Sequence, residues 1–338
     1  MQMEPLVSLV IPVFNQKHEY MRRCLESALV QPHAGLEIVV SDNCSTNGCT
    51  EFLAEISDPR LRIVKPPRHL PLIQHFAFAG FQAKGHLISF LPSDDWLEPG
   101  WLDVMLGVIE KHPEAAFAFC DINKHVMQSG EVSPYRGSGC PSRYFTDAEA
   151  MRLLGRLVCK ETSYFIVGGL IRSEAYFKCG GFHDAGARYS GDFSLGLGLI
   201  KHGGAVYETR TLANYTVWGG KHGKADAQRS AIACQDAAKI ISWAENDGVL
   251  RGIAARARFS FRKSRARLSI FFLLAYLQNA IDDPGSRRTH GEFQEHLKRL
   301  SRGWLPIWVT RLLGSAPSLR LLSLLRDRYG PKIKSFFL

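Results

Sequence analysis

Two adjacent carboxylates, Asp94 and Asp95, follow the apolar run HLISFL within the stretch LPSDDWLEPGW (residues 91–101). Like charges this close repel one another and raise each other's pKa unless a cation or a ligand lies between them. Mg²⁺ and Mn²⁺ prefer carboxylate oxygens and keep coordination positions open for phosphate groups. The pair therefore predicts a positive species at this position, for which a divalent metal is a candidate. The alternative is that both carboxylates only stabilise the start of a helix near Pro99.

The segments around this pair alternate between short apolar runs and stretches with helical spacing. The apolar runs predict strands at residues 7–14, 36–42, 61–66, 86–91 and 115–123. Helices are predicted between them at residues 19–31, 49–56, 70–85 and 99–112. This order indicates an α/β fold with a doubly wound, mostly parallel sheet. Because ligands bind outside the carboxyl ends of strands in such sheets, Asp42, Asp94 and Asp95 should converge.

The pattern changes further along the chain. Residues 127–146 are rich in Gly, Ser and Pro and predict a long loop. Another strand is predicted at 205–218, and from about residue 225 every periodic segment is helical. We therefore predict an α/β domain at 1–240, followed by an all-helical region at 241–338.

Five motifs follow one another along the α/β part: VSLVIPVFN, VVSDNCSTNGCTEFL, AKGHLISFLPSDDWLEPGWLD, LIRSEAYFKCGGF and SGDFSLGLGLIKHGG. In this order they resemble the inverting family 2 glycosyltransferases of the GT-A fold, over about residues 6–222. The resemblance implies transfer of a sugar from a nucleotide-diphosphate donor, UDP first and dTDP next, with inversion at the anomeric carbon. It also implies a glycan or lipid-linked acceptor and a role in bacterial surface-polysaccharide or lipopolysaccharide assembly.

The same resemblance implies which residues meet the donor. Asp42 would contact the base of the nucleotide, Asp94 would contact the ribose, and Asp95 would bind Mn²⁺ or Mg²⁺. The alternative for Asp42 is a structural role in a turn. The donor-binding residues implied in full are Pro12, Phe14, Asn15, Asp42, Asn43, Asp94 and Arg172. Two departures from the family pattern are Pro92, where many members have another Asp, and HLPLIQHF in place of an Asn-x-Gly motif.

The catalytic base implied by the resemblance is Asp192, in the position of an acidic pair whose first member is here Gly191. A base near the acceptor hydroxyl is what a one-step displacement needs. The alternative is that Asp192 caps the helix that follows. His222 is a candidate second metal or phosphate ligand, with a surface histidine as the alternative. Lys221 and Lys224 in the same loop could meet the diphosphate.

Three further positions carry open alternatives. Gly168 and Gly169 precede Arg172 and would let the backbone approach the donor sugar, or would allow close packing within a strand. Trp218 would stack on an acceptor sugar or be buried in the core.

Composition narrows the class of protein and its location. Hydrophobic residues make up 46% of the 338 residues, a globular composition, and no apolar run reaches the roughly 20 residues of a membrane-spanning helix. The eight cysteines form no CxxC pair, and no basic leader precedes the first strand. These features predict a cytoplasmic protein with free thiols.

Positive charge is concentrated at the C-terminal end. Residues 251–338 carry 18 Lys and Arg against 5 Asp and Glu, a net charge of +13, whereas residues 1–250 carry a net charge of −3. Basic helices with Phe259 and Phe261 suit the surface of an anionic membrane, and we expect peripheral binding at the cytoplasmic face of the inner membrane. The alternative is a helical subdomain packed on the core. No nucleic-acid motif is present, and nucleic-acid binding is not expected.

The sequence also bears on two other functions. A non-catalytic relative that binds a nucleotide or sugar is favoured by Pro92 and Gly191. A nicotinamide-dependent enzyme would need GxGxxG after the first strand, and PVFNQKHEY has no glycine there.

Overall fold

The computed structural model describes residues 6–32, 34–135, 141–157, 166–183, 187–188, 190–218, 227–266, 268–269 and 290–301. Its strands are β1 (Val7–Val13), β2 (Leu36–Asp42), β3 (Leu61–Val64), β4 (Leu87–Phe90), β5 (Trp96–Leu97), β6 (Ala115–Val126), β7 (Glu131–Tyr135), β8 (Arg143–Phe145), β9 (Leu170–Arg172) and β10 (Gly204–Val217). Its helices are α1 (His18–Leu29), α2 (Cys49–Ala54), α3 (Leu72–Gly80), α4 (Trp101–Glu110), α5 (Asp147–Leu157), α6 (Ser173–Lys178), α7 (Gly191–Leu199), α8 (Ala227–Asn246), α9 (Gly248–Arg256) and α11 (His290–Ser301).

The described strands form one mixed sheet in the order β3-β2-β1-β4-β9-β6-β10-β5, with β7 paired to β6 and β8 to β10. Strands β1 to β4 are mutually parallel, and β6 is parallel to β10. Strand β9 runs antiparallel between β4 and β6 and joins the two parallel groups. The predicted α/β fold and each of its predicted strands are confirmed.

Helices cover both faces of the sheet, as the apolar residues of β1 require. Val7, Leu9, Ile11 and Val13 join one buried cluster with α1, α2 and α4. Val10 points to the other face and joins a second cluster with α3 and α5 to α9. A strand buried on both faces has an almost continuous apolar sequence, which is why VSLVIPV was readable as a core strand.

Two sequence predictions are corrected by the structure. The loop predicted at 127–146 contains β7, which extends β6 as an antiparallel hairpin, and β8, which pairs with β10. The helix predicted to end at Gly85 ends at Gly80. The amide of Gly85 donates to Ser8 Oγ at 2.7 Å, and a Cβ at this glycine would lie 2.7 Å from the backbone nitrogen of Ser8. Gly85 is therefore needed for close approach to β1.

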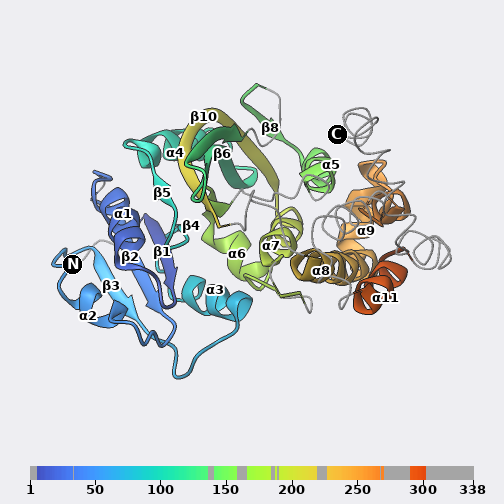
Figure 1. The fold of residues 1–338 in the computed structure, drawn as a ribbon. Coiled ribbons are helices and arrows are strands. Elements are labelled where there is room, and N and C mark those ends of the chain that lie inside the picture. Colours follow the sequence, from blue (N-terminus) through green and yellow to red (C-terminus); the bar gives the residue numbers. More distant parts are fainter. Residues whose placement is uncertain are drawn as a thin grey trace.

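The C-terminal helices gather beyond α7, on the far side of the molecule from β1, β2 and β3 (Figure 1). Helix α8 runs across residue 240, and the division of the chain into two domains there stays a prediction. Phe259 and Phe261 pack against the main core, and Arg265 pairs with Glu245 at 2.8 Å. This part of the basic region therefore packs as a helical subdomain. None of the helices in the described ranges is both long and apolar enough to cross a membrane.

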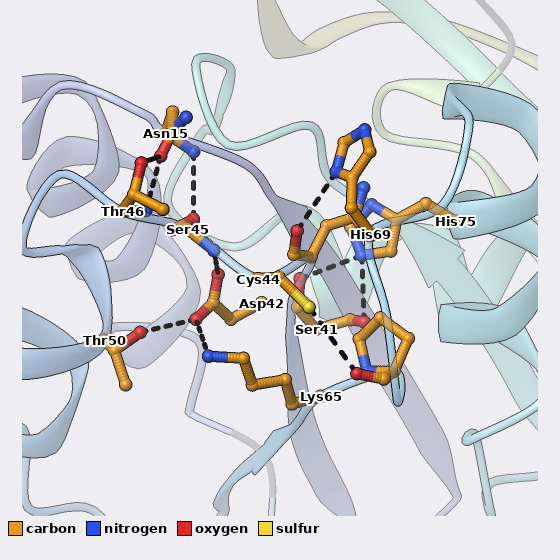
Figure 2. A network of polar contacts seen from close by, with 12 residues as sticks. Asn15, Ser41, Asp42, Cys44, Ser45, Thr46, Thr50, Lys65, His69 and His75 are labelled. Atoms are coloured by element: carbon orange, nitrogen blue, oxygen red, sulfur yellow. Dashed lines mark hydrogen bonds and ion pairs between the residues drawn. The ribbon is translucent and has the colours of Figure 1, made fainter.

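A buried histidine joins α3 to the end of β2. His75 is 2% exposed, and its Nε2 lies 3.1 Å from the carbonyl oxygen of Ser41 and 3.0 Å from the hydroxyl of the same residue (Figure 2). Burial lowers the pKa of His75 from 6.5 to about 4, against the opposing effects of the Ser41 hydrogen bond and the charge of Asp42. The imidazole is therefore neutral at physiological pH.

His75 makes the stability of the fold depend on pH. Because its pKa is lower in the folded chain than in the unfolded one, its stabilisation is complete above pH 6.5 and is lost as the pH falls toward about 4. Within this window the loss is about 1.4 kcal/mol per pH unit. His75→Gln should therefore be destabilising at pH 7.5 and much less so at pH 5, as measured by urea unfolding. His112→Gln, at a partly exposed histidine, is the control. A pH-independent difference between wild type and His75→Gln would contradict this account.

Candidate active site

The carboxyl ends of β2, β1 and β4 lie side by side at one edge of the sheet. Asp42 ends β2, Phe14 follows β1, and Asp94 and Asp95 follow β4. Neighbouring strands are about 4.8 Å apart, so the ends of β2 and β4 are separated by roughly 10 Å. The expected convergence of the three aspartates is confirmed at the level of this edge, with β1 between them.

Asp42 has a structural place in the turn that follows β2. Its carboxylate accepts hydrogen bonds from the Ser45 amide at 2.9 Å and the Thr50 hydroxyl at 2.6 Å, and lies 3.7 Å from Lys65 Nζ (Figure 2). Burial alone would raise the pKa of Asp42, but these hydrogen bonds and Lys65 lower it overall. At 1% exposure, the carboxylate stabilises the turn, which is one of the two roles predicted for it.

Two asparagines of the predicted donor set also bind the protein's own backbone. Asn15, with a positive φ of 46°, accepts the amide of Thr46 at 2.7 Å and donates its own amide to Ser45 Oγ at 2.9 Å. Asn43 is 3% exposed and exchanges two hydrogen bonds of 2.8 Å with the backbone of Leu70. These side chains join the loops after β1, β2 and β3 into one rigid rim.

An exposed aromatic pair lies on this rim. Phe14 is 47% exposed, and its ring centroid is 4.4 Å from that of His69. Pro12, two residues earlier, is buried within β1 opposite Ser41. Phe14 is thus the member of the motif whose side chain is open to a ligand. His69 was not predicted, because nothing in the sequence indicates that the loop after β3 folds back onto Phe14.

The two aspartates after β4 differ in burial. Ser93, Asp95 and Leu97 are 8%, 1% and 2% exposed, whereas Asp94 and Trp96 are partly exposed. Residues 92–95 form a turn, in which the amide of Asp95 donates to the carbonyl oxygen of Pro92 at 2.9 Å. Asp94 is therefore the more accessible of the two carboxylates. The role of Asp95 as a metal ligand stays a prediction.

Asp95 is bound into the protein. Its Oδ1 accepts the amide of Thr216 on β10 at 2.7 Å, and its Oδ2 is buried without a hydrogen-bond partner in the described structure. Burial, and secondly the charge of Asp94, raises the pKa of Asp95 well above 3.8. Asp94 also has a raised pKa because of burial, although a hydrogen bond from the indole of Trp218 to its Oδ2 opposes the rise. Trp218 is 36% exposed, so it is not the core residue that was one alternative.

Arg23 of α1 supplies a positive charge beside the two aspartates. Its Nη2 donates to the carbonyl oxygen of Asp94 at 3.2 Å, and its guanidinium lies 3.6 Å from the ring centroid of Trp96. Burial lowers the pKa of Arg23, and the charges of Asp95 and Asp94 offset part of that effect. Arg23 is 71 positions from Asp94 in the sequence, and sequence reasoning did not find it. Part of the positive charge that the pair requires thus comes from the protein.

Asp192 lies in the first turn of α7, half-buried, and its Oδ1 accepts the amide of Phe193 at 2.8 Å. Helix α7 leads into the start of β10, so its first turn lies toward the carboxyl edge of the sheet. Gly191 touches Ile73 in the first turn of α3: a Cβ at Gly191 would lie 2.9 Å from Ile73 Cγ1. This contact gives a packing reason for a glycine at this position, and it places Asp192 on the same side as the rim.

Arg172 is not part of this site. It ends β9 opposite Leu87, at the amino edge of the parallel strands. Its guanidinium donates to the carbonyl oxygens of Ala115, Ile109 and His112 at 2.8, 2.9 and 3.2 Å, closing the end of α4. Because β9 runs antiparallel, its last residue lies at the edge away from the aspartates. The donor-binding role predicted for Arg172 is corrected to a structural one.

Two other predicted features are resolved or lie outside the described residues. Gly168, with φ of 72°, packs against Ala213 and Cys120, which a Cβ would approach to 2.8 and 2.9 Å. This is the close-packing alternative. His222, Lys221 and Lys224 lie outside the described residues. Within the described ranges, no three His, Cys, Asp or Glu side chains are grouped as a metal site.

The coupling between Arg23 and Asp95 is measurable as stability. Arg23→Gln should lower the free energy of unfolding by about 1 to 3 kcal/mol, because it leaves a buried carboxylate without its positive neighbour. Adding Asp95→Asn should recover part of that loss, with a coupling energy of about 0.5 to 3 kcal/mol in a double-mutant cycle by urea unfolding. Arg22→Gln, at the exposed neighbouring position, is the matched control. Strictly additive losses would show that Arg23 and Asp95 do not interact.

Comparison with known proteins relates part of this chain to a family. Residues 8–165 match the family described as Glycosyl transferase family 2. The chain is 33% identical over 130 residues to a chondroitin synthase of Pasteurella multocida, a match that covers 38% of this chain and 13% of that protein. In three such curated relatives the match covers 13% to 14% of the relative's own length, so the chain spans only a small part of them.

Solved structures share the fold at low sequence identity. S. aureus TarS 1-349 in complex with UDP-GlcNAc superposes with a TM-score of 0.64 at 14% identity, over 97% of this chain and 92% of that one. The mannosyltransferase PcManGT from Pyrobaculum calidifontis, in complex with GDP-Man and Mn²⁺, gives 0.55 at 16% identity, over 94% and 88%. Residues 8–165, just under half of the chain, therefore match glycosyl transferase family 2, and the chain has the GT-A fold.

Proposed function

We propose that this chain is an inverting glycosyltransferase that moves a sugar from a nucleotide-diphosphate donor to a hydroxyl group of a glycan or lipid-linked acceptor in surface-polysaccharide assembly. UDP is the first donor nucleotide to test and dTDP the next. Support for the class of donor comes from the neighbours in complex with UDP-GlcNAc and with GDP-Man. Support for the product class comes from the chondroitin synthase.

The observation that carries the proposal is the gathering of three different groups at one edge of the sheet. An exposed aromatic ring, Phe14, lies at the centre. A partly exposed carboxylate, Asp94, lies in the turn after β4, the neighbour of β1, and Asp192 approaches through the contact of Gly191 with Ile73. A base platform, a phosphate-side carboxylate and a proton acceptor are what transfer from a nucleotide sugar requires.

The donor's base is assigned to the rim. Phe14 and His69 offer exposed rings on which a nucleobase stacks, an interaction of about 1 to 3 kcal/mol per base. The side chains of Asp42, Asn15 and Asn43 position these two rings indirectly, because they hydrogen-bond to the backbone of the loops around them. The contact of Asp42 with the base remains part of the proposal, through the lone pairs that its two hydrogen bonds leave.

A divalent metal, Mn²⁺ or Mg²⁺, is assigned to Asp94. The carboxylate is partly exposed, and hard cations prefer such oxygens. Because Asp95 is buried and Pro92 carries no carboxylate, Asp94 is the accessible carboxylate of residues 92–95. The remaining ligands would be diphosphate oxygens and water. When bound, the metal neutralises the charge of the diphosphate.

Asp192 is assigned the role of the base that takes the proton from the acceptor hydroxyl. The acceptor oxygen forms a bond to the anomeric carbon while the bond from that carbon to the diphosphate oxygen breaks, which inverts the configuration. The hydroxyl proton passes to the Asp192 carboxylate, and the nucleoside diphosphate leaves with the electron pair of the broken bond. The amide of Phe193 orients the carboxylate through the hydrogen bond to Oδ1.

The second candidate function is a non-catalytic relative that binds a nucleotide or sugar as a partner protein. Pro92 and Gly191 favour it, since each replaces an acidic residue common in the family. The contact of Gly191 with Ile73 gives a packing reason for one of these replacements without loss of Asp192. Turnover distinguishes the two functions.

The acceptor side of the proposal includes an anionic membrane surface, because residues 251–338 carry a net charge of +13. Phe259 and Phe261 pack against the core and are not free to insert into a membrane. Membrane binding would therefore depend on exposed cations such as Arg258, Arg262 and Lys263.

The donor site is tested by thermal shift with UDP, dTDP, GDP and CMP, each with and without Mn²⁺. A nucleotide that binds the folded chain should raise the melting temperature by several degrees, on the order of 5 °C at 100 times Kd. Asp94→Asn should remove the metal-dependent part of the shift, whereas Asp95→Asn should keep it. Asp192→Asn should keep the shift and lose release of the nucleoside diphosphate from UDP-GlcNAc or GDP-Man.

Two results would contradict the proposed enzyme function, and a third would contradict the assignment of the metal to Asp94. A folded protein that gives no shift with any nucleotide would have no donor site. Nucleotide binding with no turnover of any nucleotide sugar, and with no effect of Asp192→Asn, would favour the non-catalytic relative. Loss of the shift in Asp95→Asn but not in Asp94→Asn would return the metal to Asp95.

Membrane binding is tested by co-sedimentation with anionic and neutral phospholipid vesicles at two salt concentrations. Binding should require the anionic lipid and weaken with salt, because each cation near such a surface contributes about 1 kcal/mol. The triple variant Arg258→Gln, Arg262→Gln and Lys263→Gln should bind more weakly. Equal partitioning to both vesicle types would end this part of the proposal.

A further inference from the structure

A buried carboxylate of the C-terminal helical region binds the backbone just before the candidate base. Asp236, on α8, is 0% exposed. Its Oδ1 accepts the amide of Arg188 at 2.9 Å, and its Oδ2 accepts the amide of Ser190 at 3.2 Å. Ser190 is the N-cap residue of α7, and Asp192 is in the first turn of that helix. One side chain of α8 thus holds two backbone positions within four residues of Asp192.

The chemistry of this contact suits a charged carboxylate better than any neutral side chain. Ser190 makes no side-chain cap of its own, and the start of α7 receives, besides Asp192 in its first turn, a second carboxylate from α8. Carboxylates at a helix N-terminus interact favourably with the helix dipole, and hydrogen bonds to an ionised acceptor are stronger than neutral ones. An Asn at position 236 would offer one acceptor oxygen and turn an NH₂ group toward the other amide.

Helix α8 also supports the segment on its other side. The ring of Trp243 stacks on that of His183, with centroids 5.3 Å apart. The carbonyl oxygen of His183 accepts a hydrogen bond from Ser194 Oγ, which also donates to the carbonyl oxygen of Gly191 at 2.9 Å. Figure 1 shows α7 and α8 next to one another. The start of α7 is therefore packed between α3, through Ile73, and α8.

We propose that Asp236 is a positioning residue, which orients Asp192 by fixing the backbone of Arg188 and Ser190. The functional part of this inference rests on the proposed glycosyltransferase activity. It follows that α8, which lies outside the family match at residues 8–165, is part of the catalytic apparatus. The helical region beginning at α8 then has a task in the reaction besides any contact with an acceptor or a membrane.

The experiment compares Asp236→Asn with Asp247→Asn in the full chain. Asp247 caps α9 through the amides of Val249 and Leu250 and pairs with Lys201 at 2.6 Å, so its Asn variant also loses one charge of a partly buried carboxylate near α7 and α8. Hydrogen exchange by mass spectrometry of peptides covering residues 187–195 reports the backbone. Release of UDP from UDP-GlcNAc and of GDP from GDP-Man, with water as acceptor, reports turnover. Nucleotide thermal shifts report donor binding.

The expected result is faster exchange at residues 187–195 in Asp236→Asn alone. Its kcat should fall roughly 10- to 100-fold, as expected for a misplaced catalytic group, with KM for the donor changed less than about twofold. Asp247→Asn should match wild type in both respects.

Unchanged exchange in Asp236→Asn would overturn the proposal, as would faster exchange with unchanged kcat. A kcat loss shared equally by Asp247→Asn would also overturn it, by showing a general effect of stability. If the wild-type chain releases no nucleotide from either donor, the proposed function fails at that point. The exchange data then decide by themselves whether Asp236 holds the backbone before α7.

Discussion

The candidate site depends on a carboxylate, Asp95, that is buried where the segment between β4 and β5 contacts β10. Ionised carboxylates are strongly hydrated, and burying one is unfavourable unless hydrogen bonds and opposite charge replace the water. Asp95 receives the Thr216 amide from β10 and the nearby charge of Arg23 from α1. These partners come from distant parts of the sequence and can meet only in one register. The neighbouring Asp94, in the same turn, stays partly exposed. Of the two adjacent carboxylates, Asp94 is therefore the more accessible to a ligand.

The rim of the site follows a similar principle. Asp42, Asn15 and Asn43 are the most polar residues of the first two motifs, and all three bind backbone amides or carbonyls of neighbouring loops. Buried polar groups that are fully hydrogen-bonded make loops rigid. This rigidity is what allows an apolar ring, Phe14, to remain 47% exposed at the centre of the site. These three polar side chains of the first two motifs therefore serve to hold the loops of the site in place.

The position of Asp192, at the start of α7, depends on packing between helices. Gly191 approaches Ile73 of α3 too closely for a larger residue, and Asp236 of α8 binds the backbone just before it. A glycine at position 191 thus allows a tight contact between α7 and α3, with Asp192 as the next residue of α7. Because α8 continues into the basic helical region, the C-terminal part of the chain is joined to the site by a buried polar contact.

The sequence by itself determined strands β1 to β4, β6 and β10, the α/β class, the resemblance to the family and the edge at which the aspartates lie. Apolar periodicity and the position of residues after strands are local properties, and they can be read without knowledge of contacts. The sequence did not determine β5, β7 and β8, or the antiparallel β9 that makes the sheet mixed. Nor did it determine which aspartate is buried, that Arg172 lies at the opposite edge, or that Arg23, His69 and Asp236 contribute. Arg172 was misplaced because β9 runs antiparallel, and a strand's direction is set by its neighbours. Arg23 and Asp236 were missed because their partners are 71, 48 and 46 positions away. Only the tertiary structure brings such residues together, since a buried charge selects its partners by distance in space.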